Sequence, residues 1–114
     1  MPGHGFSKDE RIRKRAEIER IFGAGARFSC KGMRLHVLPN ALAVNRAVFV
    51  PVRSYPDSVS RNRARRLARE CWRLGKELLS PGHDVVVVLY PGTDEFRSRR
   101  SQLERLLRQA GLYA

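Results

Sequence analysis

The chain has 114 residues, of which 42% are hydrophobic, enough for one domain with one modest core. Lys and Arg number 23, 19 of them Arg, against 11 Asp and Glu, and the formal net charge of +12 makes a polyanion the expected partner. Cys30 and Cys71 form no C-x-x-C pair and the three histidines are scattered, so the sequence offers no zinc site, no redox pair and no catalytic cluster.

The first half of the chain predicts a helix followed by three strands. Residues 7–10 match a capping box, so a first helix is expected from there to about Phe22, ending at Gly23 and Gly25. Alternation of apolar and polar residues predicts strands at 27–31 and 33–38, and a third strand is expected to begin at 47–50. Gly32 is expected at a tight bend, and Pro51 confines the third strand to a sheet edge or ends it.

The second half predicts a helix, a strand and a last helix. The long helix is expected over about 60–79, and the continuous apolar run at 85–89 is typical of a strand covered on both faces. Thr93 or Asp94 is expected to cap the last helix, with Gly111 ending it. The order αβββαβα predicts a single α+β domain over 1–114, with residues 1–6 flexible.

Arginine-rich residues 60–73 carry the strongest functional pattern. At about 100° per residue they place basic and polar side chains on one arc of the helix: Arg61, Asn62, Arg65, Arg66, Arg69 and Arg73. The opposite arc is apolar, with Ala64, Leu67, Ala68, Cys71, Leu74 and Leu78, and Trp72 lies at the border, where half-buried packing is expected.

This stripe has few internal counter-ions. Only Glu70 and Glu77 are spaced to pair with the six arginines of residues 60–73, so the like charges repel one another unless an external polyanion neutralises them. A solvated basic surface is the ordinary explanation of a charge run, but the shortage of carboxylates favours phosphate. Free N–H groups expected at 61–63, at the start of the helix, would reinforce that attraction.

The run Arg61-Asn62-Arg63-x-Arg65-Arg66-x-x-Arg69-Glu70, between a short strand and a valine strand, resembles the RNR signature of bacterial ribonuclease P proteins. The resemblance covers nearly the whole chain, including the basic segment 11–15. It implies the fold of the second domain of ribosomal protein S5, with a left-handed βαβ crossover. General rules alone favour the right-handed form, in about 98% of such units.

The resemblance also implies RNA-binding sites and no catalytic or metal-binding residues in the protein. The RNA subunit would be bound by Arg61, Asn62, Arg63, Arg65, Arg66 and Arg69, with Arg73 as a weaker addition. A cleft between the first helix and the sheet would hold the single-stranded leader, lined by Lys14, Ile18, Phe22, Arg34 and His36. Further RNA contacts are expected from Arg11 and Arg53.

Aromatic stacking in that cleft would depend mainly on Phe22. His36 would be a partial substitute, because Ile18 and His36 stand where the family commonly has aromatic residues. Core packing is the alternative role for Phe22. The loop at 52–56 departs from the family pattern and keeps only the charge of Arg53, while Tyr55 is a candidate for stacking on a base.

The function that the resemblance implies is support of endonucleolytic removal of the 5′ leader of precursor tRNA, in the cytoplasm, with Mg²⁺ held mainly by a catalytic RNA. The partners would be ribonuclease P RNA and precursor tRNA, with no membrane and no small-molecule substrate. A small basic ribosomal protein, or another structural RNA-binding protein, is the alternative. A DNA-binding regulator is disfavoured, since no second helix and short turn accompany the arginine helix.

Overall fold

The computed structural model describes residues 8–114, and residues 1–6 and Ser7, with the predictions made for them, lie outside this range. Three helices and four strands make up the fold: α1 (Arg15–Ala24), β1 (Ala26–Cys30), β2 (Met33–Pro39), β3 (Arg46–Pro51), α2 (Ser58–Gly75), β4 (His83–Leu89) and α3 (Phe96–Gln109). Two short 3-10 turns add η1 (Lys8–Glu10) and η2 (Lys76–Leu78). The predicted α+β order is confirmed.

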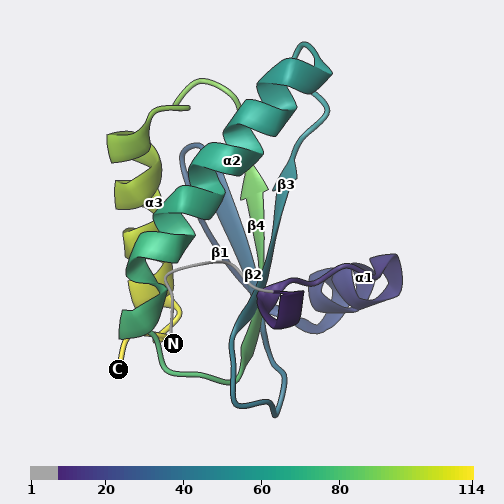
Figure 1. Ribbon diagram of the computed structural model, residues 1–114, viewed down its shortest axis with the longest axis vertical. Coiled ribbons are helices and arrows are strands. Elements are labelled where there is room, and N and C mark those ends of the chain that lie inside the picture. Colours follow the sequence, from purple (N-terminus) through teal and green to yellow (C-terminus); the bar gives the residue numbers. More distant parts are fainter. Residues whose placement is uncertain (1–7) are drawn as a thin grey trace.

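The four strands form one mixed sheet in the order β1-β2-β4-β3. β3 and β4 are parallel, while β2 is antiparallel to both β1 and β4. In Figure 1, β3 and β4 both point upward, α2 lies in front of the sheet, and β4 lies to the left of β3. The β3-α2-β4 connection is therefore left-handed, as predicted, and Pro51 lies on an edge strand.

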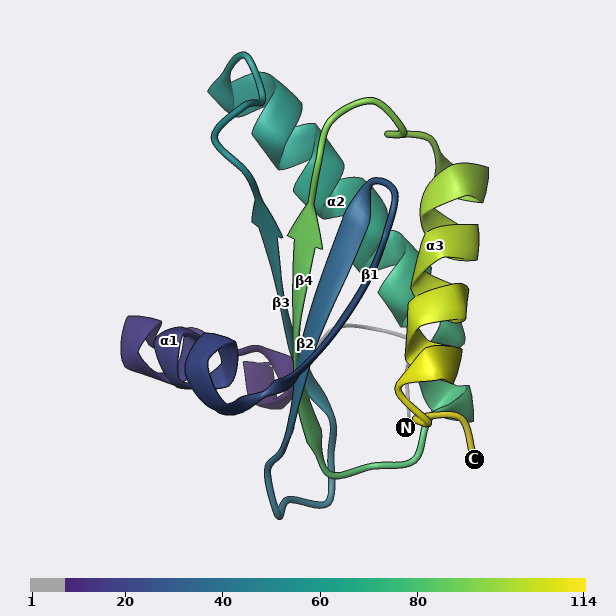
Figure 2. The ribbon, with the colours of Figure 1, turned by 180° about the vertical axis from the view of Figure 1, so that it is seen from behind.

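Helices cover the two faces of the sheet unequally. α2 and α3 lie over one face, and α1 crosses only the lower part of the other (Figure 2). Alternate residues of β4 serve the two faces: Val85 and Val87 join the core under α2 and α3, while Val86 and Val88 pack with Ile21 of α1. Burial on both sides explains the continuous valine run. None of the helices in residues 8–114 has the length and apolar character needed to cross a membrane.

The prediction for the first helix was wrong at its start. Residues 8–10 form only a 3-10 turn, and α1 begins at Arg15. Between them the chain is drawn to the open edge of β3, where the Ile12 amide donates to the Ala47 carbonyl (3.2 Å) and the Ile12 side chain is buried. Tertiary pairing therefore overrides the local capping pattern. Gly23 lies within α1, which ends at Gly25.

The long helix begins earlier than predicted, and its buried side departs from the prediction only near its C-terminal end. Asp57 accepts a hydrogen bond from the Ser60 amide (2.7 Å), so α2 starts at Ser58. Near its end, α3 packs beside α2, and the buried side turns toward Trp72, which is fully buried against Phe49. Leu74 and Leu78 are consequently exposed, Leu78 by 66%.

The last helix is not capped by the predicted residues. Glu95 occupies the N-cap position and makes no side-chain capping bond. The Asp94 carboxylate instead binds Arg99 and Tyr55, and Thr93 accepts a hydrogen bond from Gln102. Gly111, with φ of 74°, takes the left-handed conformation expected just after a helix end.

Candidate nucleic-acid interface

The arginine stripe of α2 points away from the core, as the projection predicted. Asn62, Arg63 and Arg66 are exposed, while Arg61, Arg65, Arg69 and Arg73 are half-buried. Arg65 donates to the Asn62 side-chain oxygen (2.7 Å), a contact that orders the guanidinium without neutralising it.

Internal carboxylates leave most of this stripe uncompensated. Within residues 8–114, no ion pair joins Arg61, Arg63, Arg65 or Arg66 to an Asp or Glu. Arg73 differs, since its Nε donates to Glu70 (3.0 Å). Four guanidinium groups of α2 therefore keep their charge available for an external anion.

The prediction of free N–H groups at 61–63, at the N-terminus of α2, was wrong. The helix starts two residues earlier, so the Arg61 amide already donates to the Asp57 carbonyl (3.2 Å). Hydrogen bonds from Ser60, with the nearby Arg61 charge, hold the pKa of Asp57 below its ordinary value. A carboxylate thus occupies the end of the helix where free N–H groups were expected.

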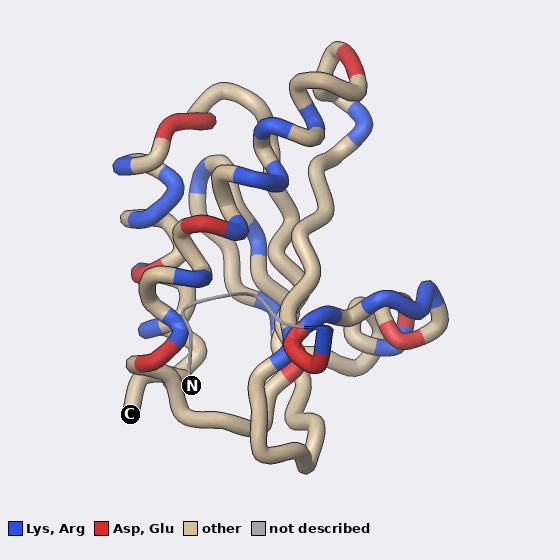
Figure 3. Tube along the Cα trace, in the orientation of Figure 1, with Lys and Arg blue, Asp and Glu red and all other residues tan. Residues whose placement is uncertain are grey.

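Cations of the N-terminal segment lie beside the α2 stripe. Arg11 and Arg13 run along β3 and, with Arg65 and Arg69, line a surface hollow of about 140 Å³. Burial, with repulsion from Arg11 and Arg65, lowers the pKa of Arg69. The structure therefore brings the predicted contact Arg11 to the α2 residues. Figure 3 shows Lys and Arg recurring along α2 and along the segment that leads into α1.

Three of the predicted cleft residues meet on the face of the sheet that α1 only partly covers. The rings of Phe22 and His36 pack edge to face with centroids 4.6 Å apart, and Arg34 Nε donates to His36 Nε2 (2.9 Å). Burial, then repulsion from Arg34 and Arg27, lowers the pKa of His36. An accepting Nε2 fits a neutral ring whose proton is on Nδ1.

These three residues offer unequal surfaces to a ligand. Phe22 is 37% exposed and can present a ring to a base, whereas His36 is only 5% exposed and supports Phe22 from behind. Tyr90 was missed by sequence reasoning, although the alternation Val86, Val88, Tyr90 predicts its face. The Arg34 guanidinium carbon lies 6.0 Å from the centre of its ring.

Of the other two predicted cleft residues, Ile18 lies one turn before Phe22 on the same face of α1, whereas Lys14 lies apart from the group. Ile18 is half-buried in the core under α1, packed with Ile12, Val86 and neighbouring residues. Lys14 occupies the N-cap position of α1, two turns from Phe22, and lines a separate hollow of about 550 Å³ with Arg11 and Arg13.

The loop between β3 and α2 is held against the fold by the buried side chain of Tyr55. Arg53 is exposed, but Tyr55 is buried and its hydroxyl donates to Asp94 (2.8 Å), so the proposed stacking of Tyr55 on a base is wrong. Burial and the Asp94 bond raise the pKa of Tyr55 to about 12.

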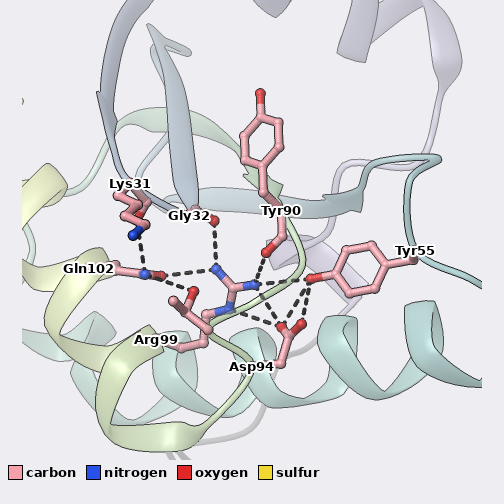
Figure 4. Close-up of polar contacts among 8 residues, drawn as sticks. Lys31, Gly32, Tyr55, Tyr90, Asp94, Arg99 and Gln102 are labelled. Carbon is pink, nitrogen blue, oxygen red and sulfur yellow. Dashed lines mark hydrogen bonds and ion pairs between the residues drawn. The ribbon is translucent and has the colours of Figure 1, made fainter.

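Arg99 holds this loop against the rest of the fold. Its fully buried guanidinium donates to the Gly32 carbonyl (2.6 Å), the Tyr90 carbonyl (2.5 Å), Asp94 (2.7 Å) and the Tyr55 hydroxyl (3.0 Å), as Figure 4 shows. The cluster joins the β1–β2 turn, the end of β4, α3 and the segment leading into α2. It therefore anchors the segment that leads into the arginine helix.

Comparisons with known proteins identify the family. The family model described as Ribonuclease P matches residues 6–111. The chain belongs to the ribonuclease P protein family. It is 32% identical over 105 residues to the ribonuclease P protein component of Caldanaerobacter subterraneus subsp. tengcongensis, covering 90% of each chain. The component from Clostridium acetobutylicum is 31% identical over 109 residues, covering 92% of each.

Solved structures of ribonuclease P proteins share the fold. The protein from Thermotoga maritima superposes with a TM-score of 0.79 at 25% identity, covering 88% of this chain and 96% of that one. One from Staphylococcus aureus gives 0.82 at 20% identity, covering 92% and 98%. The resemblance seen in the sequence is confirmed for family and fold.

Proposed function

We propose that this member of the ribonuclease P family is the protein subunit that binds the catalytic RNA through α2 and the 5′ leader of precursor tRNA beside Phe22. Family membership supports an RNA partner and a role as a subunit of an endoribonuclease. The observation that carries the proposal is the α2 stripe, in which Arg61, Arg65 and Arg66 have no carboxylate partner within residues 8–114.

In this proposal the chemistry belongs to the RNA. Among residues 8–114 no three His, Cys, Asp or Glu side chains cluster in a way that could hold a metal ion. Mg²⁺ held mainly by the RNA would supply the activated water for phosphodiester cleavage. The protein screens repulsion between RNA strands and captures the leader, so it raises substrate affinity and lowers the Mg²⁺ requirement. The proposed location is the cytoplasm.

Leader capture is supported by the group around Phe22. The exposed ring of Phe22 packs on His36, which also accepts a hydrogen bond from Arg34. A stacking platform near a positive charge is how single strands are bound without strict sequence preference. Phosphate contacts from Arg34 would hold the strand along the sheet.

The test of the α2 assignment is a salt titration of binding to ribonuclease P RNA. Replacing Arg65 and Arg66 together by Ala should weaken binding and flatten the slope of log affinity against log salt by about 2, since each neutralised phosphate contributes about 0.7 to 0.9. The matched control is Arg100→Gln with Glu104→Gln, which removes an internally paired cation and anion from α3 and should leave the slope unchanged. Equal slopes for all three proteins would contradict the assignment.

The test of the function is reconstitution of precursor cleavage at low Mg²⁺. The unmodified chain should restore cleavage by a ribonuclease P RNA, and the Arg65, Arg66 variant should need more protein or more Mg²⁺. Failure of the unmodified chain to stimulate cleavage, despite a folded protein by circular dichroism, would reject the proposal in favour of another RNA-binding role.

A further inference from the structure

A second arginine-rich surface lies on α3, which carries five arginines and one glutamate. Arg99 is buried in the cluster described above. Arg100 lies on the side next to α2, where it lines a hollow with Cys71 and pairs with Glu104 (3.6 Å). The remaining three are exposed and fall within an arc of about 80° at 100° per residue. We call this set the outer α3 face, and its members are Arg97, Arg105 and Arg108.

Within residues 8–114, the one carboxylate of α3, Glu104, borders the outer α3 face and is paired with Arg100. None of its three arginines forms an ion pair with a carboxylate in the part of the chain that the structure describes. The Arg108 guanidinium carbon lies 5.3 Å from the centre of the Tyr113 ring, and this stacking orients the group while its N–H donors stay free. An anionic ligand would therefore relieve the repulsion among the three arginines of this face.

The spacing and composition of the face fit a phosphate backbone. Arg97 and Arg108 are separated by about 16 Å along the helix axis, enough to span several phosphates of one strand. The exposed residues between them are polar or charged, such as Ser101 and Glu104. The exposed ring of Phe96 lies beside Arg100, on the side next to α2. A protein partner would need an apolar centre, which this face lacks.

We infer that the outer α3 face binds a second segment of structured RNA, separate from the segment held by α2. The α2 stripe continues into the hollow with Arg11 at the β3 edge, whereas α3 packs over β1 and β2 at the other end of the sheet. The two cationic surfaces thus lie toward opposite edges, and the protein joins two RNA segments. This inference rests on the proposed RNA partnership.

Charge removal tests the face directly. Replacing the three arginines of the outer α3 face by Gln should weaken binding to ribonuclease P RNA and flatten the salt slope by about 2, with urea unfolding unchanged because the side chains are exposed. The matched control is Arg100→Gln with Glu104→Gln, a neutral change on the same helix that should bind like the unmodified protein. Unchanged affinity and slope in the triple variant would overturn the inference and leave a protein partner as the alternative.

Tethered hydroxyl-radical cleavage tests whether the two segments are distinct. The probe would be attached at Ser101→Cys on α3 or at Val59→Cys on α2, the latter 76% exposed, in a Cys30→Ser background. Cys71 can remain, since it is buried and burial raises its pKa to about 11.

Each outcome of that mapping is decisive. Cleavage of different RNA segments from the two positions supports the inference. Cleavage from Val59→Cys alone, or of the same nucleotides from both, overturns it while the proposed function stands. Absence of any binding by the unmodified protein overturns both.

Discussion

The two faces of the sheet handle polar groups in opposite ways. On the face covered by α2 and α3, the buried Arg99 meets a carboxylate, a hydroxyl and two carbonyls within the protein. On the face partly covered by α1, Arg34 has one hydrogen bond to His36 and a ring contact with Tyr90. Both are arginines near the sheet, but only the second retains donors for a ligand.

This difference separates structural arginines from binding arginines. A guanidinium removed from water must have its donors satisfied internally, because an unpaired buried charge is strongly unfavourable. One that remains half-exposed can exchange water for phosphate at little cost. The number of internal partners, more than the residue type, therefore indicates which arginines serve stability and which serve RNA binding.

The largest effect is expected on the closed face. Arg99→Ala should lower the free energy of unfolding by about 3–5 kcal/mol, because Asp94 and two buried carbonyls would lose their partner. The measurement is urea unfolding followed by circular dichroism. Arg34→Ala is the matched control on the open face and should cost about 0.5–1.5 kcal/mol, the range for one hydrogen bond. Similar losses for both variants would remove the distinction between the faces.

A smaller loss of stability is expected from a substitution at Tyr55, which belongs to the same buried cluster as Arg99. Tyr55→Phe keeps the ring in the core but deletes the hydroxyl that donates to Asp94 and accepts from Arg99. The expected loss of stability is about 1–2 kcal/mol, with RNA affinity unchanged at a temperature where the variant is folded. Full stability in this variant would show that Arg99 holds the loop without the hydroxyl.

Sequence patterns predicted the fold where local and tertiary preferences agree. The valine run, the bend at Gly32 and the edge position of Pro51 each follow from burial or backbone geometry that one residue type satisfies. The start of α1 could not be predicted, since the free edge of β3, distant in sequence, supplies the competing hydrogen bond to Ile12.

The candidate site was also predicted only where local sequence determines it. The α2 stripe is local, so helical periodicity places it correctly. Arg99 lies within two residues of the exposed Arg97 and Arg100, and only the folded chain shows that it alone is buried. The sequence around Tyr55 does not predict its hydrogen bond to Asp94, which is 39 residues away.

On the open face, Phe22→Ala should change substrate selection more than stability. Loss of one stacking platform is expected to cost about 1 kcal/mol, roughly fivefold in affinity, for precursor tRNA with a leader. Affinity for mature tRNA should not change. Binding of both RNAs is compared by filter titration with the reconstituted holoenzyme, and an equal loss for both would mean that Phe22 serves only as packing for His36.

The smallest expected effect is a pH dependence from His36. Its pKa is lowered in the fold by burial and by Arg34 and Arg27, so the folded protein favours the neutral ring. The unfolded chain binds a proton near pH 6.5, so stability is full above that pH and declines as the pH falls below it. His36→Gln should therefore flatten the stability curve between pH 7 and about 5. At pH 8 the His36 ring is neutral in both the folded and the unfolded chain, so the stabilities of the two proteins at this pH provide the reference. Parallel curves of stability against pH for the two proteins would show that the His36 ring takes up a proton as readily in the folded state as in the unfolded state. The open face would then contain no group that must be neutral.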